Sequence, residues 1–307
     1  MVLFSRRRRS SVADAIRRAS ATTVETIRAL ARKSSASFAR RLSIEELRCK
    51  VLDKVKRENI NVHPKDREML VEDELFLRRF ETEYSTEKDT NWRKCLPDKV
   101  VDVLTWRSDF GVHKLRPEGF PAELYQSELF SFYEQPDEKP LVFLDQAKLR
   151  KVSGWNEHII KFIICQLVRL LPRIGNRQVS LVCDASNIGI ANLELGIELS
   201  YIIAFYFPGL CDAVYVVDMP WMYRTPFNVM LKVFPERLRS KVKSIDRKSI
   251  INQLGRDRLP PLFDGKCAKI ELISELTPEN AISLDEFTLH NSISPSSTKK
   301  FVSEYCK

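Results

Sequence analysis

The chain has 307 residues, of which 44% are hydrophobic, and a formal net charge of +9, so it is long enough to bury the core of one large domain or two small ones. No apolar run reaches the roughly 18–20 residues that a transmembrane helix needs, and the basic run Arg6–Arg9 interrupts any secretory signal. Seven cysteines without a CxxC pair and four scattered histidines predict a reduced, intracellular protein without a metal site.

Residues 1–42 carry the entire excess of positive charge. They contain eleven Arg and Lys residues against two acidic residues, whereas the rest of the chain is neutral. Val12, Ile16 and Ile27 recur at helical spacing, but Ala, Thr and Ser dilute the apolar face. Two interpretations are therefore open, a solvated and disordered segment or a weak amphipathic helix.

A helical front region is predicted from residue 43 to about residue 116. Ser43–Glu46 resembles a capping box, which would begin a helix that ends near Glu58. Further helices are predicted over residues 66–80, 86–95 and 98–108. In the helix over 66–80, the apolar spacing predicts that Leu70, Leu75, Phe76 and Leu77 point inward and that Arg78 and Arg79 point outward.

After Pro121, predicted strands alternate with predicted helices. The strands are Leu141–Leu144, Val179–Cys183 and Val214–Val217, and the helices between them are Asn156–Leu171 and Leu193–Phe207. This alternation predicts an α/β fold with a mostly parallel sheet flanked by helices. The end of the chain, from residue 268, is rich in Ser, Glu and Asn, which predicts a loose polar segment.

One further helix, after Pro220, is apolar on more than one side. Thr225 and Pro226 form a good N-cap and first-position pair, which predicts a helix that ends near Phe234. Its main apolar face has the spacing i, i+3, i+4 and i+7, at Phe227, Met230, Leu231 and Phe234. Two hypotheses fit: an ordinary core helix, or a helix that moves between protein and lipid.

Catalytic motifs are absent from the sequence. No glycine-rich phosphate loop and no GxSxG elbow occurs, so we expect no catalytic residue, no cofactor and no metal. Asp145, Asp184 and Asp218 each follow a predicted strand, and we interpret them as caps of loops or neighbouring helices. The enzyme alternative is an unrecognised hydrolase whose activity would require Asp184.

Several segments follow one another in a recognisable order along the chain. Asp73–Phe80 and Leu104–Arg107 are similar to the helical front region of the CRAL-TRIO, Sec14-like lipid-binding family. The successive blocks of its lipid-binding domain resemble Pro140–Leu149, Val179–Asn187, Phe205–Pro208, Val216–Trp221 and Leu259–Gly265. The likeness covers roughly residues 70–267. The Asp-Met-Pro-Trp variant at 218–221 is similar to the motile sperm domain-containing protein 2 branch, without the second domain or membrane anchor of that branch.

The resemblance implies a sheet floor, an apolar pocket and a gate helix at about Trp221–Phe234, with one hydrophobic ligand such as a phospholipid or an isoprenoid-like molecule. The pocket and gate residues implied are Phe143, Val179, Leu181, Tyr201, Phe205, Val216, Met219, Trp221, Met222, Phe227, Met230, Leu231 and Phe234. Family members that exchange phosphatidylinositol pair a Glu with a Lys. Here Lys241 stands at the Lys position, as a candidate contact for an anionic headgroup, but Gly209 stands at the Glu position. The Ser/Thr pair that holds phosphatidylcholine falls on Val179 and Leu181, which are apolar.

The basic segment suits electrostatic docking on the anionic cytoplasmic face of a membrane. The membrane-addressing candidates are Arg6, Arg7, Arg8, Arg9, Arg17 and Arg18. Ser20 and Ser43 follow Arg-Arg pairs and are candidate phosphorylation sites, where added negative charge would weaken docking. A mitochondrial transit peptide is the alternative. We expect no nucleic-acid partner, because this segment has almost no aromatic residues for stacking.

The sequence thus predicts a cytoplasmic, peripheral membrane protein that binds a hydrophobic ligand and transfers it between membranes. The alternative is an adaptor or tether that uses the same fold without transfer. The predicted divisions are a basic tail (1–42), a helical front subdomain (43–116), a CRAL-TRIO domain (117–267) and a loose polar tail (268–307).

Overall fold

The computed structural model describes residues 43–85, 92–135, 138–267 and 278–306. Contacts divide the chain into two units, Met1–Glu45 and Glu46–Lys307, and the features below belong to the second unit. The predicted basic tail, with its arginines and Ser20, lies outside the described residues. Ser43 is exposed and directly precedes helix α2 (Ile44–Arg57), and its capping role stays a prediction.

The front region contains three further helices, α3 (Pro64–Glu72), α4 (Glu74–Tyr84) and α5 (Trp92–Phe110). The prediction of one helix over residues 66–80 is wrong, because Asp73 has extended backbone and its carboxylate accepts hydrogen bonds from the N–H groups of Leu75 and Phe76. The prediction of a break near residue 97 is also wrong: Pro97 lies inside α5, near its start. Residues 86–91 of the helix expected there lie outside the described residues.

Two side chains of α4 point opposite to the prediction. Leu75 is 38% exposed, whereas Arg79 is buried. The guanidinium of Arg79 donates to the carbonyl oxygens of Leu171 and Gly175, at the C-terminal end of helix α7 (Asn156–Ile174). The carbonyl of Leu171 also accepts from the N–H of Gly175, the residue that caps α7. A cation at this end interacts favourably with the helix dipole, which explains why Arg79 is inside.

The described residues form one five-stranded sheet in the order β1-β2-β3-β4-β5. The strands are β1 (Phe130–Tyr133), β2 (Leu141–Asp145), β3 (Val179–Asp184), β4 (Cys211–Val217) and β5 (Val242–Ile245). Strands β2 to β5 are parallel, and β1 pairs antiparallel with β2. The mostly parallel sheet is confirmed, and its three middle strands are the predicted ones. The two edge strands, β1 and β5, are not among the predicted strands.

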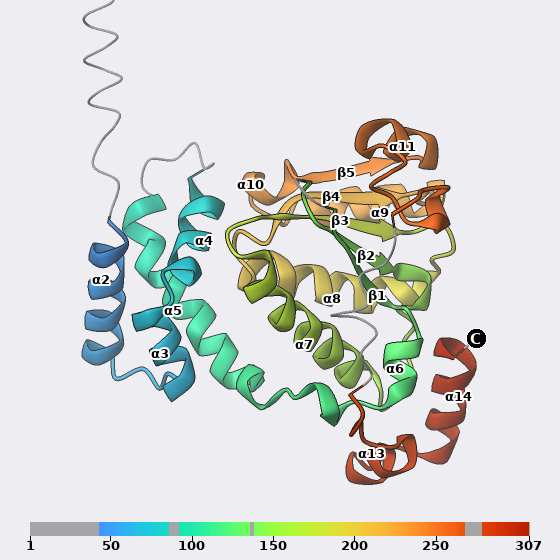
Figure 1. The fold of residues 1–307 in the computed structure, drawn as a ribbon, viewed down its shortest axis with the longest axis horizontal. Coiled ribbons are helices and arrows are strands. Elements are labelled where there is room, and N and C mark those ends of the chain that lie inside the picture. The colour runs from blue at the N-terminus through green and yellow to red at the C-terminus, as the bar shows by residue number, and fades with distance from the viewer. Residues whose placement is uncertain (1–42, 86–91, 136–137, 268–277, 307) are drawn as a thin grey trace, which may run out of the picture. The chain divides into compact units, whose positions relative to one another are not determined.

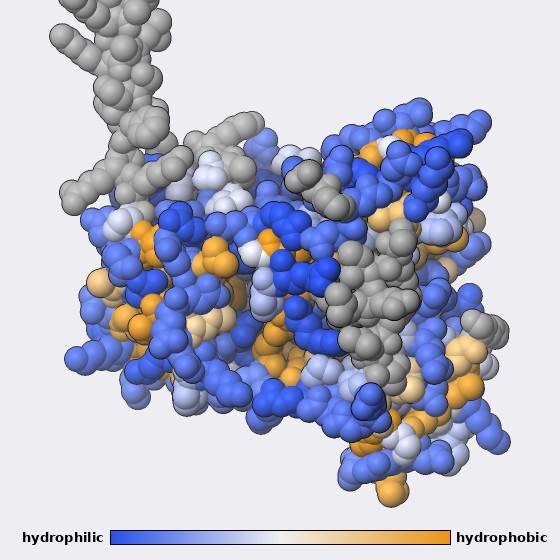
Figure 2. Space-filling view, viewed as in Figure 1, coloured by the Kyte–Doolittle hydropathy of each residue, from blue (hydrophilic) through white to orange (hydrophobic). Residues whose placement is uncertain are grey.

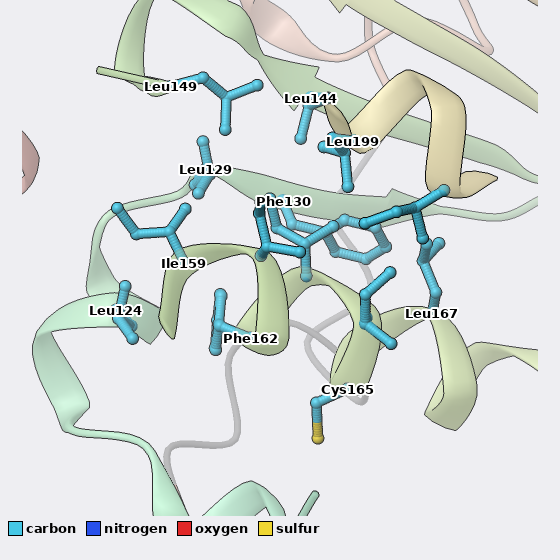
Figure 3. Packing of buried hydrophobic residues seen from close by; sticks show 14 of the residues in the cluster. Leu124, Leu129, Phe130, Leu144, Leu149, Ile159, Phe162, Cys165, Leu167 and Leu199 are labelled. Carbon is cyan, nitrogen blue, oxygen red and sulfur yellow. The ribbon is translucent and has the colours of Figure 1, made fainter. Parts of the chain in front are cut away.

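Helices cover both faces of the sheet (Figure 1). Helix α7 packs on one face together with α8 (Ile190–Tyr206), and α11 (Arg247–Leu254) packs on the other. Alternate residues of each strand point to opposite faces. Thus Leu144 belongs to the core under α7 and α8, while its neighbour Phe143 packs against Phe263 on the α11 side. Figure 3 shows part of the first core, with Ile159, Phe162 and Leu167 along α7.

Short elements connect these layers. They are α6 (Ala122–Gln126), α10 (Glu236–Arg239) and the 3-10 helices η1 (Val112–Lys114), η2 (Pro117–Gly119), η3 (Gln146–Lys148) and η4 (Pro261–Phe263).

The end of the chain is packed rather than loose. Residues 278–306 include α13 (Leu284–His290) and α14 (Pro295–Tyr305), and residues 268–277 lie outside the description. The ring of Trp155, which is fully buried, stacks on Phe301 at 3.7 Å between centroids and on Phe287 at 5.4 Å. The prediction of a loose polar tail is therefore wrong for these residues, because a few spaced aromatic side chains dock two otherwise polar helices on the core.

The face drawn in Figure 2 is mostly hydrophilic, with apolar residues in patches between polar ones. Across the described part of the chain, the helices are too short or too polar to cross a bilayer.

Candidate ligand-binding cavity

A cavity of about 100 Å³, the main cavity, lies on the α8 side of the sheet. Its floor comes from strands β2 to β4, through Leu144, Leu181, Cys183, Val214 and Val216. Leu199, Ser200, Ile203 and Ala204 of α8 form one wall. The opposite wall is Phe227, Met230 and Leu231 of helix α9 (Trp221–Leu231), together with Phe234. The lining is mainly apolar, as a site for a hydrophobic molecule requires.

Two smaller cavities share walls with the main cavity. The second, of about 70 Å³, shares Gln146, Ser200, Phe227 and Met230 with it and also contacts Met219. The third, of about 10 Å³, shares Leu144, Leu181, Ile203 and Cys211 and is lined by Val179. The main cavity is therefore adjacent to both of the smaller ones.

The structure brings most of the sequence-predicted pocket residues to these cavities. Seven line the main cavity, namely Leu181, Val216, Phe227, Met230, Leu231, Phe234 and Lys241. Met219 and Val179 line the second and third cavities. Their contact with a ligand stays a prediction.

Other predicted pocket residues lie elsewhere. Phe143 faces the α11 side of the sheet, because it differs by one position from the cavity-facing Leu144. Tyr201 is 48% exposed and packs on Phe205, whose ring in turn contacts the cavity residue Phe234 at 5.9 Å between centroids. Trp221 and Met222 are 78% and 55% exposed on the outside of α9.

Helix α9 covers the cavity, although none of its side chains is fully buried in the protein core. Its inward residues keep the predicted spacing from Phe227 to Leu231. The helix begins at Trp221 rather than at Thr225, so Pro226 lies inside it. It tolerates this proline because Pro226 and Met222, whose carbonyl loses its usual donor, are both exposed to solvent.

The strand-end carboxylates contact backbone N–H groups or a basic side chain. Asp145 accepts from the N–H of Ala147, and Asp184 accepts from that of Ser186. The guanidinium of Arg247 bridges two strand ends, with Nε 3.2 Å from Asp218 and one terminal nitrogen 3.3 Å from Asp184. These contacts match the interpretation of the three residues as caps. Asp184 and Asp218 also share a basic partner, Arg247, which is distant from both in the sequence. They also fix the loop that precedes α9.

The charged end of the main cavity is formed by Glu83 of α4 and Lys241, after α10. Lys241 Nζ lies 2.6 Å from Glu83 Oε2, and the N–H of Gly209 donates to the same oxygen at 3.1 Å. Arg237 Nε lies 3.6 Å from Glu83 Oε1, and its guanidinium stacks on the ring of Tyr84 at 4.3 Å. Glu83 itself is 3% exposed.

The family resemblance predicts a carboxylate at position 209, where this chain has glycine. The structure supplies the carboxylate from Glu83, which is 126 residues away from Gly209. A side chain at 209 would not fit, because a Cβ there would lie 2.5 Å from the carbonyl oxygen of Arg79. No local pattern in the sequence marks Glu83. Alternation within a strand would have identified Cys183 from Leu181 and Val214 from Val216. Leu144 lies on a different strand, β2, and only the sheet register aligns it with Cys183.

Two buried thiols, Cys183 and Cys211, line the main cavity. Burial raises the pKa of Cys183 to about 12 and that of Cys211 to about 12, so both stay protonated and unreactive near neutral pH. Within the described ranges, no group of three or more His, Cys, Asp or Glu side chains could hold a metal ion.

Comparisons with known proteins agree with this geometry. Residues 130–265 match the model of the CRAL/TRIO domain. The crystal structure of Sfh5 is similar with a TM-score of 0.55 and 15% sequence identity, over 80% of this chain and 93% of that chain, which bears on the fold alone. Comparison with curated proteins gives no match. The predicted place in the motile sperm domain-containing protein 2 branch stays a prediction.

A CRAL/TRIO domain implies binding of a lipid or another small hydrophobic molecule, and the apolar cavity lies within the matched residues except for Glu83. Residues 130–265 are therefore identified as a CRAL/TRIO domain.

Proposed function

We propose that this protein encloses one hydrophobic ligand, a phospholipid or an isoprenoid-like molecule, in the main cavity and transfers it between membranes. The observation that carries the proposal is an apolar cavity between the sheet and α8, covered by a helix that has no buried side chain of its own. Burial of each methylene group of a ligand would stabilise the complex by about 0.8 kcal/mol. Ligand binding needs no covalent step, and we assign none.

Helix α9 acts as the gate in this proposal. Ion pairs hold the chain on both sides of it: Arg247 binds Asp218 before the helix, and Glu83 binds Lys241 after it. Between these two ion pairs, α9 contacts the rest of the protein mainly through apolar side chains that line the cavity. Such contacts are not directional, so the helix can exchange them for contacts with lipid.

The outer side of the gate supports opening at a membrane. Trp221, Met222 and Val229 of α9 and the following Val233 are all exposed, at 78%, 55%, 60% and 80%. An exposed group of large apolar side chains marks an interaction surface, and Trp favours the interface between water and lipid. We infer that this surface enters the membrane when the gate opens.

The basic segment adds electrostatic attraction to the proposal. Arg6–Arg9, Arg17 and Arg18 would bind anionic lipid headgroups of the cytoplasmic face, with about 1 kcal/mol for each engaged side chain. Phosphorylation of Ser20 or Ser43 would weaken this attraction by adding negative charge. Double replacement of these serines by Glu should therefore lower binding to anionic liposomes, and unchanged binding would contradict this role.

The decisive experiment is native mass spectrometry of the purified protein, followed by lipid extraction. We expect one bound hydrophobic molecule per chain and transfer of it from donor to acceptor liposomes. A protein that purifies empty and takes up no lipid would contradict the proposal and would favour an adaptor or tether.

A further inference from the structure

The charged end of the main cavity should affect whether the cavity binds anionic ligands. Glu83 and Lys241 are the charged side chains among the described residues that line this cavity, and they contact each other directly. The Glu83 carboxylate also accepts from Gly209 N–H and faces Arg237. An anionic group that enters from the cavity therefore meets a lysine that already has a carboxylate partner.

Placing a second anion beside Glu83 is unfavourable. Both oxygens of Glu83 are in contact with the cationic side chains, and the residue is almost fully buried, so water screens a new charge poorly. Removing Glu83 without replacement is also unfavourable, because it would leave a buried cation without its partner. Exchange of one anion for another avoids both costs.

We propose that Glu83 is a specificity-determining residue of the cavity, and that the phosphate group of a lipid must displace its carboxylate from Lys241 in order to bind. The inference rests on the proposed function and states how the cavity discriminates between neutral and anionic lipids. A neutral lipid leaves the ion pair in place, whereas a lipid phosphate takes over the contacts with Lys241 and Arg237.

The displacement has a consequence for the front region. Glu83 lies near the end of α4, and the adjacent Tyr84 accepts a hydrogen bond from Arg237 at 3.3 Å. Loss of the Glu83 contacts with Gly209 and Lys241 would remove polar contacts that hold this end of α4 to the sheet domain. The amides of α4 should then exchange with solvent more readily when a phosphate-bearing lipid is bound.

The test compares two lipids that have identical acyl chains, phosphatidic acid and diacylglycerol. In Glu83→Gln, which keeps the shape but removes the charge, the ratio of the affinity for phosphatidic acid to that for diacylglycerol should rise about tenfold over wild type. The matched control is Glu74→Gln, because Glu74 is exposed at the start of the same helix and should leave the ratio unchanged. In Glu83→Gln/Lys241→Met, the gain should be lost.

Hydrogen exchange of the wild-type protein provides a test that does not depend on folding of the variants. Phosphatidic acid should increase exchange in α4, whereas diacylglycerol should leave it unchanged. Inorganic phosphate alone should also have no effect, because no acyl chain carries it into the apolar cavity. The same response to inorganic phosphate would contradict assignment to a lipid.

Two results would overturn the inference while leaving the proposed function intact. One is a lower affinity ratio in Glu83→Gln, which would mean that Glu83 positions Lys241 for the phosphate instead of competing with it. The other is an α4 response that is equal for both lipids. Failure of every protein to take up either lipid would overturn the inference as well. The proposed function would fail with it only if the purified protein also carries no other hydrophobic molecule in native mass spectrometry.

Discussion

Gly209 and Arg79 are in backbone contact across two regions of the chain: a Cβ on Gly209 would lie 2.5 Å from the carbonyl oxygen of Arg79. Gly209 also has a φ of +65°, which other residues rarely adopt. This contact lets α4 approach the turn before β4 closely enough for Glu83 to reach the cavity. The charged end of the cavity therefore depends on the close packing of α4 against the turn before β4.

The first prediction concerns this contact. Gly209→Ala should destabilise the protein by about 1–3 kcal/mol, because both the strained φ and the clash oppose the new side chain. Urea unfolding would measure the change. Gly119→Ala is the control, since nothing lies within 4 Å of a Cβ there. Similar unfolding free energies for the two variants would show that the backbone contact is looser than described.

Filling the main cavity should prevent ligand binding without unfolding the protein. Ala204 on α8 lines the cavity, so Ala204→Phe would place a ring in the space that a ligand needs. We expect at least a tenfold loss of lipid that copurifies with the protein, measured by lipid extraction. Glu198→Phe, on the exposed side of the same helix, should retain the lipid. If Ala204→Phe retains its normal lipid content, the ligand binds outside the main cavity.

The exposed apolar side of the gate should control transfer rather than affinity. Trp221→Ala/Val233→Ala removes two large apolar side chains, each of which contributes about 1.5–3 kcal/mol when it enters an apolar medium. Lipid transfer between liposomes should slow at least tenfold, while the amount of bound lipid stays unchanged. Leu289→Ala is the control, because Leu289 is equally exposed on α13. Equal slowing by the control would contradict a specific role for the gate.

The two cavity thiols should resist alkylation. Only the thiolate reacts, and burial raises the pKa of Cys183 and of Cys211 to about 12, so the reactive form gains population only as the pH rises toward that value. At pH 8, iodoacetamide should modify the exposed Cys49 and Cys95 and leave these two intact, as peptide mass spectrometry would show. Rapid modification of Cys183 or Cys211 in the native protein would indicate that the cavity opens often without a membrane.

The packed C-terminal helices should contribute to stability. Phe301→Ala removes a fully buried ring that stacks on Trp155, with an expected loss of about 3–5 kcal/mol in the free energy of unfolding. The neighbouring Val302 is partly exposed, and Val302→Ala should cost less than about 1 kcal/mol. Thermal unfolding measures both, and equal effects would show that α14 is not part of the core.

The pattern of apolar residues predicted the layers of the fold because it reflects burial directly. The middle strands are continuous apolar runs, as strands covered on both faces must be, and α9 shows the spacing of a helix that lines a cavity. Errors arose where a single residue decides the local structure. Asp73 divides a continuous apolar pattern by capping a new helix, and Pro97 and Pro226 lie within helices that continue.

By itself, the sequence determined the parallel sheet, the CRAL/TRIO domain and most of the apolar lining, because these depend on periodicity and on ordered local blocks. Only the tertiary structure decided which face of the sheet each side chain joins and which groups meet at the charged end. Glu83 and Lys241 are 158 residues apart, and no local pattern records that they pair. Their meeting depends on the close approach of α4 to Gly209, so it is a property of packing between elements rather than of any one element.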